Sequence, residues 1–577
     1  MSAIVLSPEQ LAAIFTPGHL LIRAGAGAGK TEVLARRFAA LVGGEIEGHQ
    51  PLPPERIAAI TFTEKAAWDM RARIETVLRD RFAAEGDSRQ VDLRRAIRLL
   101  PLARISTIHA FCARILRENA AEAGLDPDFQ VLDEHESRTY FESLCRRGLV
   151  DAIRRGDPGA IHLGRAYRMN DGKREGAVTI LMRIAAECAR MGRAPLWMVE
   201  ATRRTADQIA AAKDRVAELA AELVIQTEQL LTLKRVGGNA EGALAILRTR
   251  WPELRKLIDE LNRGAAPEKF DFLRDFIELL PEARSQAVKP FVRAIREIVE
   301  AGGGRFGLDG GLIKAYGEFR GAARAVEVAN LVGTVAESFE RAKSADRVVT
   351  FDDLLIKVRD LLRDRPEVVN RYRAALDALL VDEYQDTDPV QDEIVRLIAA
   401  PGSTRPELFI VGDEKQSIYR FRGADVKVFN AAAARALLTL PLRENRRSVP
   451  NLLSFVNALS AHAMKPQESP APPYWVEWRS EHELRSVRDA TLDPKIEIIA
   501  AVDAAPNGGR ASAPRNAAEK RPVEAAAIAA RISALISGGE PVVDPVSGAP
   551  RPAEYRDVAI LFRAFTDVAI YERALTL

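Results

Sequence analysis

The chain has 577 residues, of which 47% are hydrophobic and 28% charged, a globular composition that can bury sizeable cores and predicts several domains. Lys and Arg number 83 against 81 Asp and Glu, so the net charge of +2 argues neither for nor against nucleic acid, and any basic track must be local. The three cysteines do not have a metal-binding spacing, and no signal peptide is visible. No apolar run approaches the ~20 residues of a membrane span. We therefore expect a soluble, cytoplasmic protein without a membrane partner.

The first predicted strand leads into a loop of alternating Ala and Gly. Residues 20–23 begin with three apolar residues before Arg23, as in a short buried parallel strand, and apolar residues recur at helical spacing in residues 31–39. In such a strand–loop–helix, backbone N–H groups and the helix N-terminus attract phosphate. We therefore expect this loop to bind a nucleotide through Ala24, Gly25, Ala26, Gly27, Ala28, Gly29, Lys30 and Thr31.

Each part of the loop has an expected role. Gly27 and Gly29 would let the backbone approach phosphate, Lys30 would reach the terminal phosphates, and the Thr31 hydroxyl would bind Mg²⁺. The strict pattern has Gly where Ala24 stands. The alternative is a flexible connector that contains Lys-Thr by chance.

The middle of the chain, residues 121–345, is predicted to be almost entirely helical. A seven-residue spacing of apolar residues predicts one long helix that packs on a partner. Packing within this region is the favoured interpretation, and a partner-binding arm is the alternative. The spaced residues are Ile209, Val216, Leu223 and Leu230.

A second acidic site is expected after the strand at residues 379–382. Asp382 would hold Mg²⁺, directly or through water, and Glu383 would polarise the attacking water, because ligands bind at the carboxyl ends of parallel strands. The alternative is a solvated acidic turn. Further strands are expected at residues 57–63 and 409–412.

Six motifs in sequence order resemble the superfamily 1 helicases of the UvrD type. They are "AGAGAGKT", "TFTEKAAWDMRARI", "STIHAFC", "VDEYQDTD", "VGDEKQSIYRFRGAD" and "ENRRS". The sequences "STIHAFC" and "QSIYRFRGAD" are most similar to those of the RecB/AddA branch, the motor subunits of helicase–nucleases.

The resemblance implies further roles at the nucleotide. Gln10 matches the glutamine that reads adenine, with a donor and an acceptor on one side chain. Gln416 matches a γ-phosphate sensor linked to DNA, and Arg447 an arginine that contacts the γ-phosphate. Arg446 stands where relatives carry an aromatic ring over the adenine. A guanidinium group can still stack on a base, but the resemblance does not predict the affinity and selectivity for the base at this position. The alternatives are an ordinary polar residue for Gln10 and a surface arginine for Arg447.

The resemblance also implies a track for single-stranded DNA. Phe62, Tyr419 and Phe421 match base-contacting positions, and stacking on such rings contributes about 1–3 kcal/mol per base. Contacts on the phosphate side are expected from Thr61, Thr63, Lys65 and His109. The alternatives are a core role for Phe62 and a structural role for His109.

The implied fold is α/β: a RecA-like P-loop core, built as a parallel sheet with flanking helices, with a large all-helical insertion and an incomplete second RecA-like core. The expected parts are residues 1–120 and 346–440 for the first core, 121–345 for the insertion and 441–577 for the second core. Strands are expected within "KIEIIAAV" (495–502) and "DVAILF" (557–562). The family's last two motifs are not found before residue 577, which predicts a truncated chain.

The implied function is an ATP- and Mg²⁺-dependent 3′→5′ helicase and translocase on single-stranded DNA in double-strand break repair. Its expected partners are single-stranded DNA, a junction of single- and double-stranded DNA, and a second helicase–nuclease subunit. The alternative is a module that binds ATP and single-stranded DNA without motor activity. A P-loop regulator unrelated to DNA would leave "TFTEKAA" and "QSIYRFRGAD" unexplained.

Overall fold

The computed structural model describes residues 5–84, 87–167, 176–190, 196–234, 236, 239–262, 276–280, 287–300, 311–399, 405–419, 423–435, 438–465, 474–488, 492, 496–499, 517–544 and 547–576. The chain forms two compact units. The sheet unit comprises Met1–Cys112 and Leu361–Leu577, and the helical unit comprises Ala113–Asp360. The boundaries fall within α5 (Ile108–Glu118) and α14 (Phe351–Asp364). The four-part division expected from the sequence stays a prediction.

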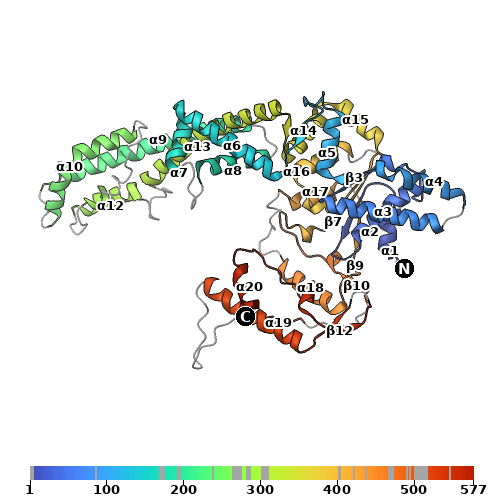
Figure 1. Ribbon diagram of the computed structural model, residues 1–577. Coiled ribbons are helices and arrows are strands. Elements are labelled where there is room, and N and C mark those ends of the chain that lie inside the picture. Colours follow the sequence, from blue (N-terminus) through green and yellow to red (C-terminus); the bar gives the residue numbers. More distant parts are fainter. Residues whose placement is uncertain are drawn as a thin grey trace. The chain divides into compact units, whose positions relative to one another are not determined.

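A parallel sheet of six described strands forms the centre of the sheet unit (Figure 1). Its order is β3-β2-β6-β7-β1-β8, and every neighbouring pair is parallel. All residues of β2 and β6 are buried, as expected for a parallel sheet covered on both faces. The strands are β1 (Leu20–Ala24), β2 (Ile57–Thr61), β3 (Arg104–Thr107), β6 (Ala378–Val381), β7 (Glu407–Gly412) and β8 (Leu438–Leu442).

Helices pack against this sheet and bury its apolar side chains. Helix α2 (Lys30–Gly43) contacts β7, and α3 (Glu64–Ala84) contacts β2 and β3 (Figure 1). Val33 and Phe38 of α2 join the strands in one buried core. The other helices of this unit are α1 (Pro8–Phe15), α4 (Asp87–Leu99), α15 (Pro366–Ala375), α16 (Pro389–Ile398), α17 (Val426–Ala434), α18 (Pro450–Ala463), α19 (Ala517–Ser537) and α20 (Val568–Thr576). Its remaining strands are the pairs β9 (Glu444–Asn445) with β10 (Arg485–Ser486), and β11 (Pro541–Val543) with β12 (Pro550–Pro552).

The strands expected in the first core are confirmed, with small shifts at their ends. The strand expected at 57–63 ends at Thr61, because Thr63 Oγ1 accepts a hydrogen bond from the N–H of Ala66 (3.1 Å) where α3 begins. This side-chain cap satisfies a backbone donor that the first turn of a helix leaves unpaired.

The strands expected at 495–502 and 557–562 are wrong for the residues that the structure describes there. Residues 496–499 and 558–562 are not in strands, and Ile498 and Leu561 are 85% and 94% exposed. A strand requires a neighbour that accepts its backbone hydrogen bonds, and no described strand pairs with either segment. Apolar composition alone was therefore insufficient evidence for a strand.

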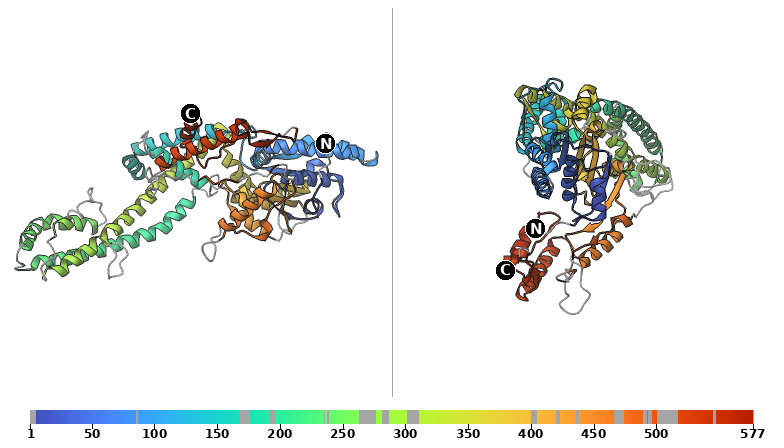
Figure 2. Two further views of the ribbon diagram at one scale, coloured as in Figure 1. Left: turned by 90° about the horizontal axis from the view of Figure 1, so that it is seen from below. Right: turned by 90° about the vertical axis from the view of Figure 1, so that its right-hand side faces the viewer.

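The helical unit has two apolar clusters, and the long helices α9 and α13 contact each other along their lengths (Figure 2, left). Val216, Leu223 and Leu230 of α9 are buried among residues of α10, α12 and α13, which confirms packing within the region as the reason for the seven-residue spacing. The helices are α6 (Glu134–Arg154), α7 (Pro158–Tyr167), α8 (Ala177–Arg190), α9 (Leu196–Thr232), α10 (Asn239–Asn262), α12 (Lys289–Glu300) and α13 (Leu312–Asp346). Two-residue strands β4 (Gln130–Val131) and β5 (Val348–Val349) pair in parallel. None of the described helices combines the length and apolarity needed to cross a membrane.

Candidate nucleotide and nucleic-acid site

The loop between β1 and α2 has a backbone that only glycine adopts without strain. Gly27 and Gly29 have φ values of 72° and 81°. A Cβ atom on Gly27 would lie 2.7 Å from Asn445 Nδ2 and 2.9 Å from Arg447 Cβ. The loop is thus closely covered by the segment that follows β8, and it has no room for a side chain at Gly27.

Neighbouring side chains and backbone hold the carbonyl groups of this loop. Asn445 Nδ2 donates to the Ala26 carbonyl (2.5 Å), and the N–H of Arg446 donates to the Gly27 carbonyl (3.0 Å). Gln10 Nε2 donates to the Ala28 carbonyl (3.0 Å). Three successive carbonyls therefore face neighbouring segments, an orientation that suits an anion-binding loop because the N–H groups must face the anion.

The two acidic residues after β6 lie next to the P-loop lysine. Lys30 Nζ pairs with Glu383 Oε2 at 2.5 Å, and Gln385 Nε2 donates to the same oxygen at 2.7 Å. Glu383 has a φ of 48°, which is uncommon for a residue with a side chain and is typical of strained functional sites. Thr31 is exposed in the first turn of α2, next to Lys30 in the chain.

Burial changes the proton affinity of the carboxyl groups at this edge of the sheet. Desolvation raises the pKa of Asp382 to about 7, with a further increase from the charge of Glu383 and an opposing effect of Lys30. Desolvation and the charge of Glu383 likewise raise the pKa of Asp386 to about 6. A buried carboxyl group that is costly to ionise alone gains strongly from a bound cation, so Asp382 fits the expected Mg²⁺ ligand.

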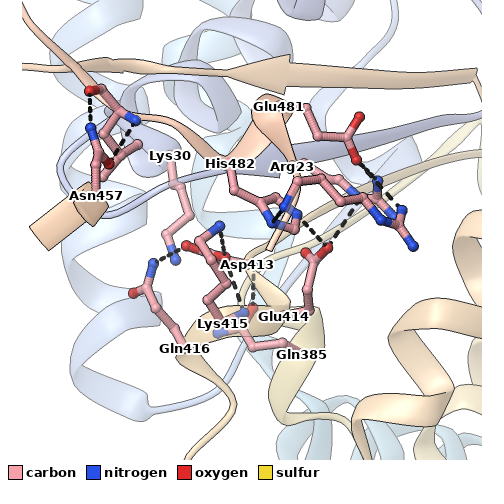
Figure 3. A network of polar contacts seen from close by, with 12 residues as sticks. Arg23, Lys30, Gln385, Asp413, Glu414, Lys415, Gln416, Asn457, Glu481 and His482 are labelled. Carbon is pink, nitrogen blue, oxygen red and sulfur yellow. Dashed lines mark hydrogen bonds and ion pairs between the residues drawn. The ribbon is translucent and has the colours of Figure 1, made fainter. Parts of the chain in front are cut away.

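A second set of polar residues joins the ends of β6 and β7 (Figure 3). Gln385 Oε1 accepts from the N–H of Asp413 (3.0 Å), and the Asp413 carboxylate accepts from Gln416 Nε2 (2.7 Å). Lys415 Nζ also contacts Asp413 at 2.7 Å. Gln416 is therefore connected to Glu383 through Asp413 and Gln385.

Residues 480–486, which we call the clamp segment, contact three parts of the site, and no motif or periodicity in the sequence predicts this. His482 Nε2 lies 3.1 Å from Glu414 Oε1, and Arg23 Nε lies 3.4 Å from the same oxygen (Figure 3). Glu481 pairs with Arg23, and a Cβ on Gly25 would lie 2.3 Å from Leu484 Cδ2.

The contacts of the clamp segment hold Glu414 in its ionised form. Burial alone would raise the pKa of Glu414, but the hydrogen bond from His482 and the charge of Arg23 outweigh it and lower this pKa to about 2. Glu414 lies within the predicted motif "VGDEKQ", whereas His482 lies in no motif. Only the structure could therefore identify the pair.

The predicted base-side residues Gln10 and Arg446 contact each other. Arg446 Nη2 donates to Gln10 Oε1 at 3.2 Å. Gln10 is buried, and Arg447 is exposed beside Gly27. The structure thus places Gln10, Arg446 and Arg447 beside the loop, and the Gln10 amide, which the resemblance predicts to read the base, is already hydrogen-bonded.

The aromatic residues expected on the DNA track form a stacked pair. The rings of Phe62 and Tyr419 are 5.2 Å apart with an interplanar angle of 27°. Phe421 lies outside the described residues. Phe62 lies in the loop after β2, and Tyr419 lies in the loop after β7. The strands β2 and β7 are both parallel to β6, so they end at the same edge of the sheet.

The residues expected at the DNA phosphates differ in accessibility. Thr63 and Lys65 are exposed at the start of α3, whereas Thr61 is buried and its Oγ1 donates to the Thr63 carbonyl (3.1 Å). His109 is a helix residue whose pKa is lowered by burial, against the opposing charge of Glu64. Thr63 and Lys65 are thus better placed for direct contact than Thr61 or His109.

Comparison with known proteins agrees with these motifs. Residues 6–233 and 311–436 match the family described as the UvrD/REP helicase N-terminal domain. A protein from Geobacillus kaustophilus (strain HTA426), named as the A subunit of an ATP-dependent helicase/nuclease, is 31% identical, over 97% of this chain and 47% of that protein. The proteins of the same name from Listeria monocytogenes serotype 4b (strain F2365) and Geobacillus thermodenitrificans (strain NG80-2) are 27% and 29% identical, over 98% and 97% of this chain and 48% and 47% of their own lengths. The chain spans about half the length of the curated relatives it matches.

Proposed function

This chain belongs to the UvrD/REP helicase family, and we propose that it is an ATP-driven DNA helicase that moves 3′→5′ along single-stranded DNA during double-strand break repair. The observation that carries the proposal is the contact of Lys30 with Glu383, at the same edge of the sheet as the stacked pair of Phe62 and Tyr419. One edge thus carries both the Gly-rich loop with its carboxylates and a pair of stacked aromatic rings. A P-loop protein without a nucleic-acid function would not need the second feature.

The P-loop and the residues after β6 fit Mg²⁺ and ATP. Gly27 leaves no space for a side chain, and Asp382 is a buried carboxyl group with a raised pKa. Thr31 and Asp382 would hold the Mg²⁺, and residues 24–31 the phosphates. When bound, Mg²⁺ neutralises charge on the transferred phosphoryl group.

The protein's own residues supply the remaining chemistry. Glu383 accepts the proton of the attacking water, and for this its ion pair with Lys30 must open as Lys30 turns to the phosphates. Arg447 adds positive charge beside the loop, where negative charge is spread over the phosphate oxygens in the transition state. Gln416 senses this change through Asp413 and Gln385.

On the DNA side, Phe62 and Tyr419 separate to accept a base or present a ring face to it, while Thr63 and Lys65 contact the backbone. Tyr419 lies three residues after Gln416, so the phosphate sensor and the platform share one loop. This proximity couples nucleotide state to the grip on the strand.

The names of the relatives describe one subunit of a helicase and nuclease. We accordingly propose that this chain works in a cytoplasmic assembly with a second subunit, on DNA that joins single- and double-stranded parts. The second candidate function is binding of ATP and single-stranded DNA without turnover. It is favoured by one observation: in this structure Lys30 and Glu383 form an ion pair with each other.

The test is steady-state ATP hydrolysis by the 577-residue chain, with and without single-stranded DNA, beside Glu383→Gln. We expect stimulation by DNA and a loss of at least about 10²-fold in turnover for Glu383→Gln, in the range that general base catalysis contributes. Nucleotide affinity should be retained in this variant. Binding of both ligands without turnover by the unmodified chain would favour the second candidate, and absence of ATP binding would reject both.

A further inference from the structure

The turn that follows Glu383 holds its backbone in an uncommon conformation. Glu383 has left-handed dihedral angles (φ 48°, ψ 44°) and precedes the 3₁₀ turn η3 (Tyr384–Asp386), which lies between β6 and α16. The Glu383 carbonyl accepts from the N–H of Asp386 at 3.0 Å, and the Tyr384 carbonyl accepts from the N–H of Thr387 at 3.1 Å. A residue with a side chain keeps such a conformation only where its surroundings impose it, so the turn needs an anchor.

Tyr384 anchors this turn to α16. It is 1% exposed, and its hydroxyl donates to Asp392 Oδ1 at 2.7 Å. Burial and the negative charge of Asp392 raise the pKa of Tyr384, so the hydroxyl keeps its proton and acts as the donor. Because Tyr384 is the residue directly after Glu383, this bond limits how far the backbone at Glu383 can rotate.

Asp392 is itself held by two arginines. It is buried in the first turn of α16, and its carboxylate accepts from Arg435 Nη1 and Arg396 Nε, each at 2.8 Å. Oδ1 thus binds Tyr384 and Arg435, and Oδ2 binds Arg396, so both oxygens of this buried carboxylate have partners. Such charge-assisted bonds make Asp392 a fixed acceptor for the Tyr384 hydroxyl. Asp392 lies in none of the six motifs, which therefore assign it no role.

The side chain of Glu383 is oriented from the same turn. Gln385 Nε2 donates to Glu383 Oε2 at 2.7 Å, while Gln385 Oε1 accepts from the N–H of Asp413 at 3.0 Å. Glu383 Oε2 also pairs with Lys30 at 2.5 Å. Gln385 and Lys30 thus fix the carboxylate, whereas Tyr384 fixes the backbone that carries it.

We propose that Asp392 is a positioning residue for ATP hydrolysis, which acts through Tyr384 to hold the Glu383 carboxylate beside the P-loop. The inference rests on the proposed role of Glu383 as the base, and it adds the contact that keeps this base in place. A general base must lie within hydrogen-bond distance of the proton that it accepts. A misplacement of about 1 Å can lower a rate by about 10²-fold, so loss of the Tyr384 bond should slow turnover more than it weakens ATP binding.

The experiment is steady-state ATP hydrolysis by the full chain, with single-stranded DNA, for Tyr384→Phe, which removes only the hydroxyl group. We expect kcat to fall by about tenfold or more and the KM for ATP to stay within about threefold. Asp392→Ala removes the acceptor and should lower kcat by a similar factor; if it does not fold, Tyr384→Phe decides the question. The control is Tyr571→Phe, which removes the same kind of bond because the Tyr571 hydroxyl of α20 donates to Glu524 of α19 at 2.9 Å. This variant should keep its kcat.

A double-variant cycle separates positioning from a general loss of structure. Glu383→Gln already lacks the base, so adding Tyr384→Phe to it should lower kcat by less than about twofold further. A smaller loss than expected in Tyr384→Phe, or a further loss of about twofold or more in the Glu383→Gln background, overturns the inference and leaves the role of Glu383 intact. If the unmodified chain does not hydrolyse ATP, or if Glu383→Gln hydrolyses it equally fast, the proposed role of Glu383 is wrong, and the inference with it.

Discussion

The two units of this chain use charge in different ways. In the sheet unit, buried or half-buried ion pairs join segments far apart in the sequence, such as Lys30 with Glu383 and Arg23 with Glu414. In the helical unit, several ion pairs lie within one helix at a spacing of four residues, and its interior is made of two apolar clusters. Lys343 and Asp353 form a buried exception, 2.6 Å apart.

This difference shows where the chain accepts the cost of desolvating charge. Taking an ion out of water costs several kcal/mol, which is recovered only with a well-placed partner. The sheet unit accepts that cost at both ends of its strands: Lys30 with Glu383 lies at the carboxyl ends, and Arg37 with Glu407 and Arg56 with Asp377 lie at the amino ends. The helical unit has no comparable set among its described residues and is held together mainly by apolar area.

The largest expected effect is that of Lys30→Ala on nucleotide binding. The change removes the cation expected at the terminal phosphates and leaves Glu383 without its 2.5 Å partner, so a carboxylate would face the phosphates unopposed. We expect ATP affinity to fall by about 10²-fold or more, which corresponds to at least about 2.7 kcal/mol. Calorimetric titration with Mg²⁺ and ATP measures this, with Lys427→Ala, at an exposed lysine of α17, as the control. Affinity within threefold of the unmodified chain would contradict the assigned role.

The next effect is on stability rather than on ligand binding. Leu223 of α9 is fully buried, and Leu223→Ala should lower the free energy of unfolding of the helical unit by about 2–5 kcal/mol through lost apolar contact and a cavity. Ile225, two residues along the same helix and 48% exposed, provides the control Ile225→Ala, with less than about 0.5 kcal/mol expected. Urea unfolding measures both variants. Equal effects would show that α9 does not pack as described.

The first core could be predicted from sequence because its signals are local. Each of three local signals can be interpreted without a distant partner: the apolar run at 20–22, the Gly-rich loop, and the acidic pair that follows residues 379–381. The same reasoning failed at 495–502 and 557–562, where an apolar run resembled a strand although the described structure has no strand beside it. Strand pairing is a property of two segments, and composition reports on only one.

The candidate site shows the same limit. Lys30, Asp382 and Glu383 were expected, and their proximity follows from the parallel sheet. The contact of His482 with Glu414 was not expected, because 68 residues separate them and neither periodicity nor a motif points to His482. The engagement of Gln10 by Arg446 was equally invisible, since a pattern names residue types and not which lone pairs are already used.

A smaller effect concerns the clamp segment and depends on pH. Glu414 has a pKa of about 2 against an ordinary value of 4.5, so the folded state favours its ionised form. This contribution, roughly 3 kcal/mol at most, is fully present above pH 4.5 and is lost as the pH falls toward 2.

Glu414→Gln should therefore be less stable than the unmodified chain at pH 7, and the difference should shrink between pH 4.5 and 2. Thermal unfolding at several pH values measures this. Glu481→Gln removes a carboxylate that is 40% exposed, and its effect should be smaller at every pH. A difference that stays constant from pH 7 to pH 3 would mean that Glu414 does not gain its low pKa from His482 and Arg23.

The smallest expected effect concerns an exposed ion pair of the helical unit. Arg293 and Glu297 of α12 lie four residues apart with side chains 54% and 31% exposed, so water screens their attraction. Arg293→Ala should change the free energy of unfolding by only about 0.3–0.5 kcal/mol and leave ATP hydrolysis unaltered. Urea unfolding of Arg293→Ala, Glu297→Ala and the double variant gives the coupling energy of this pair directly. A coupling above about 1 kcal/mol would show that even an exposed pair of the helical unit stabilises it as strongly as a buried pair, whereas a small value would agree with the screening expected for an exposed pair.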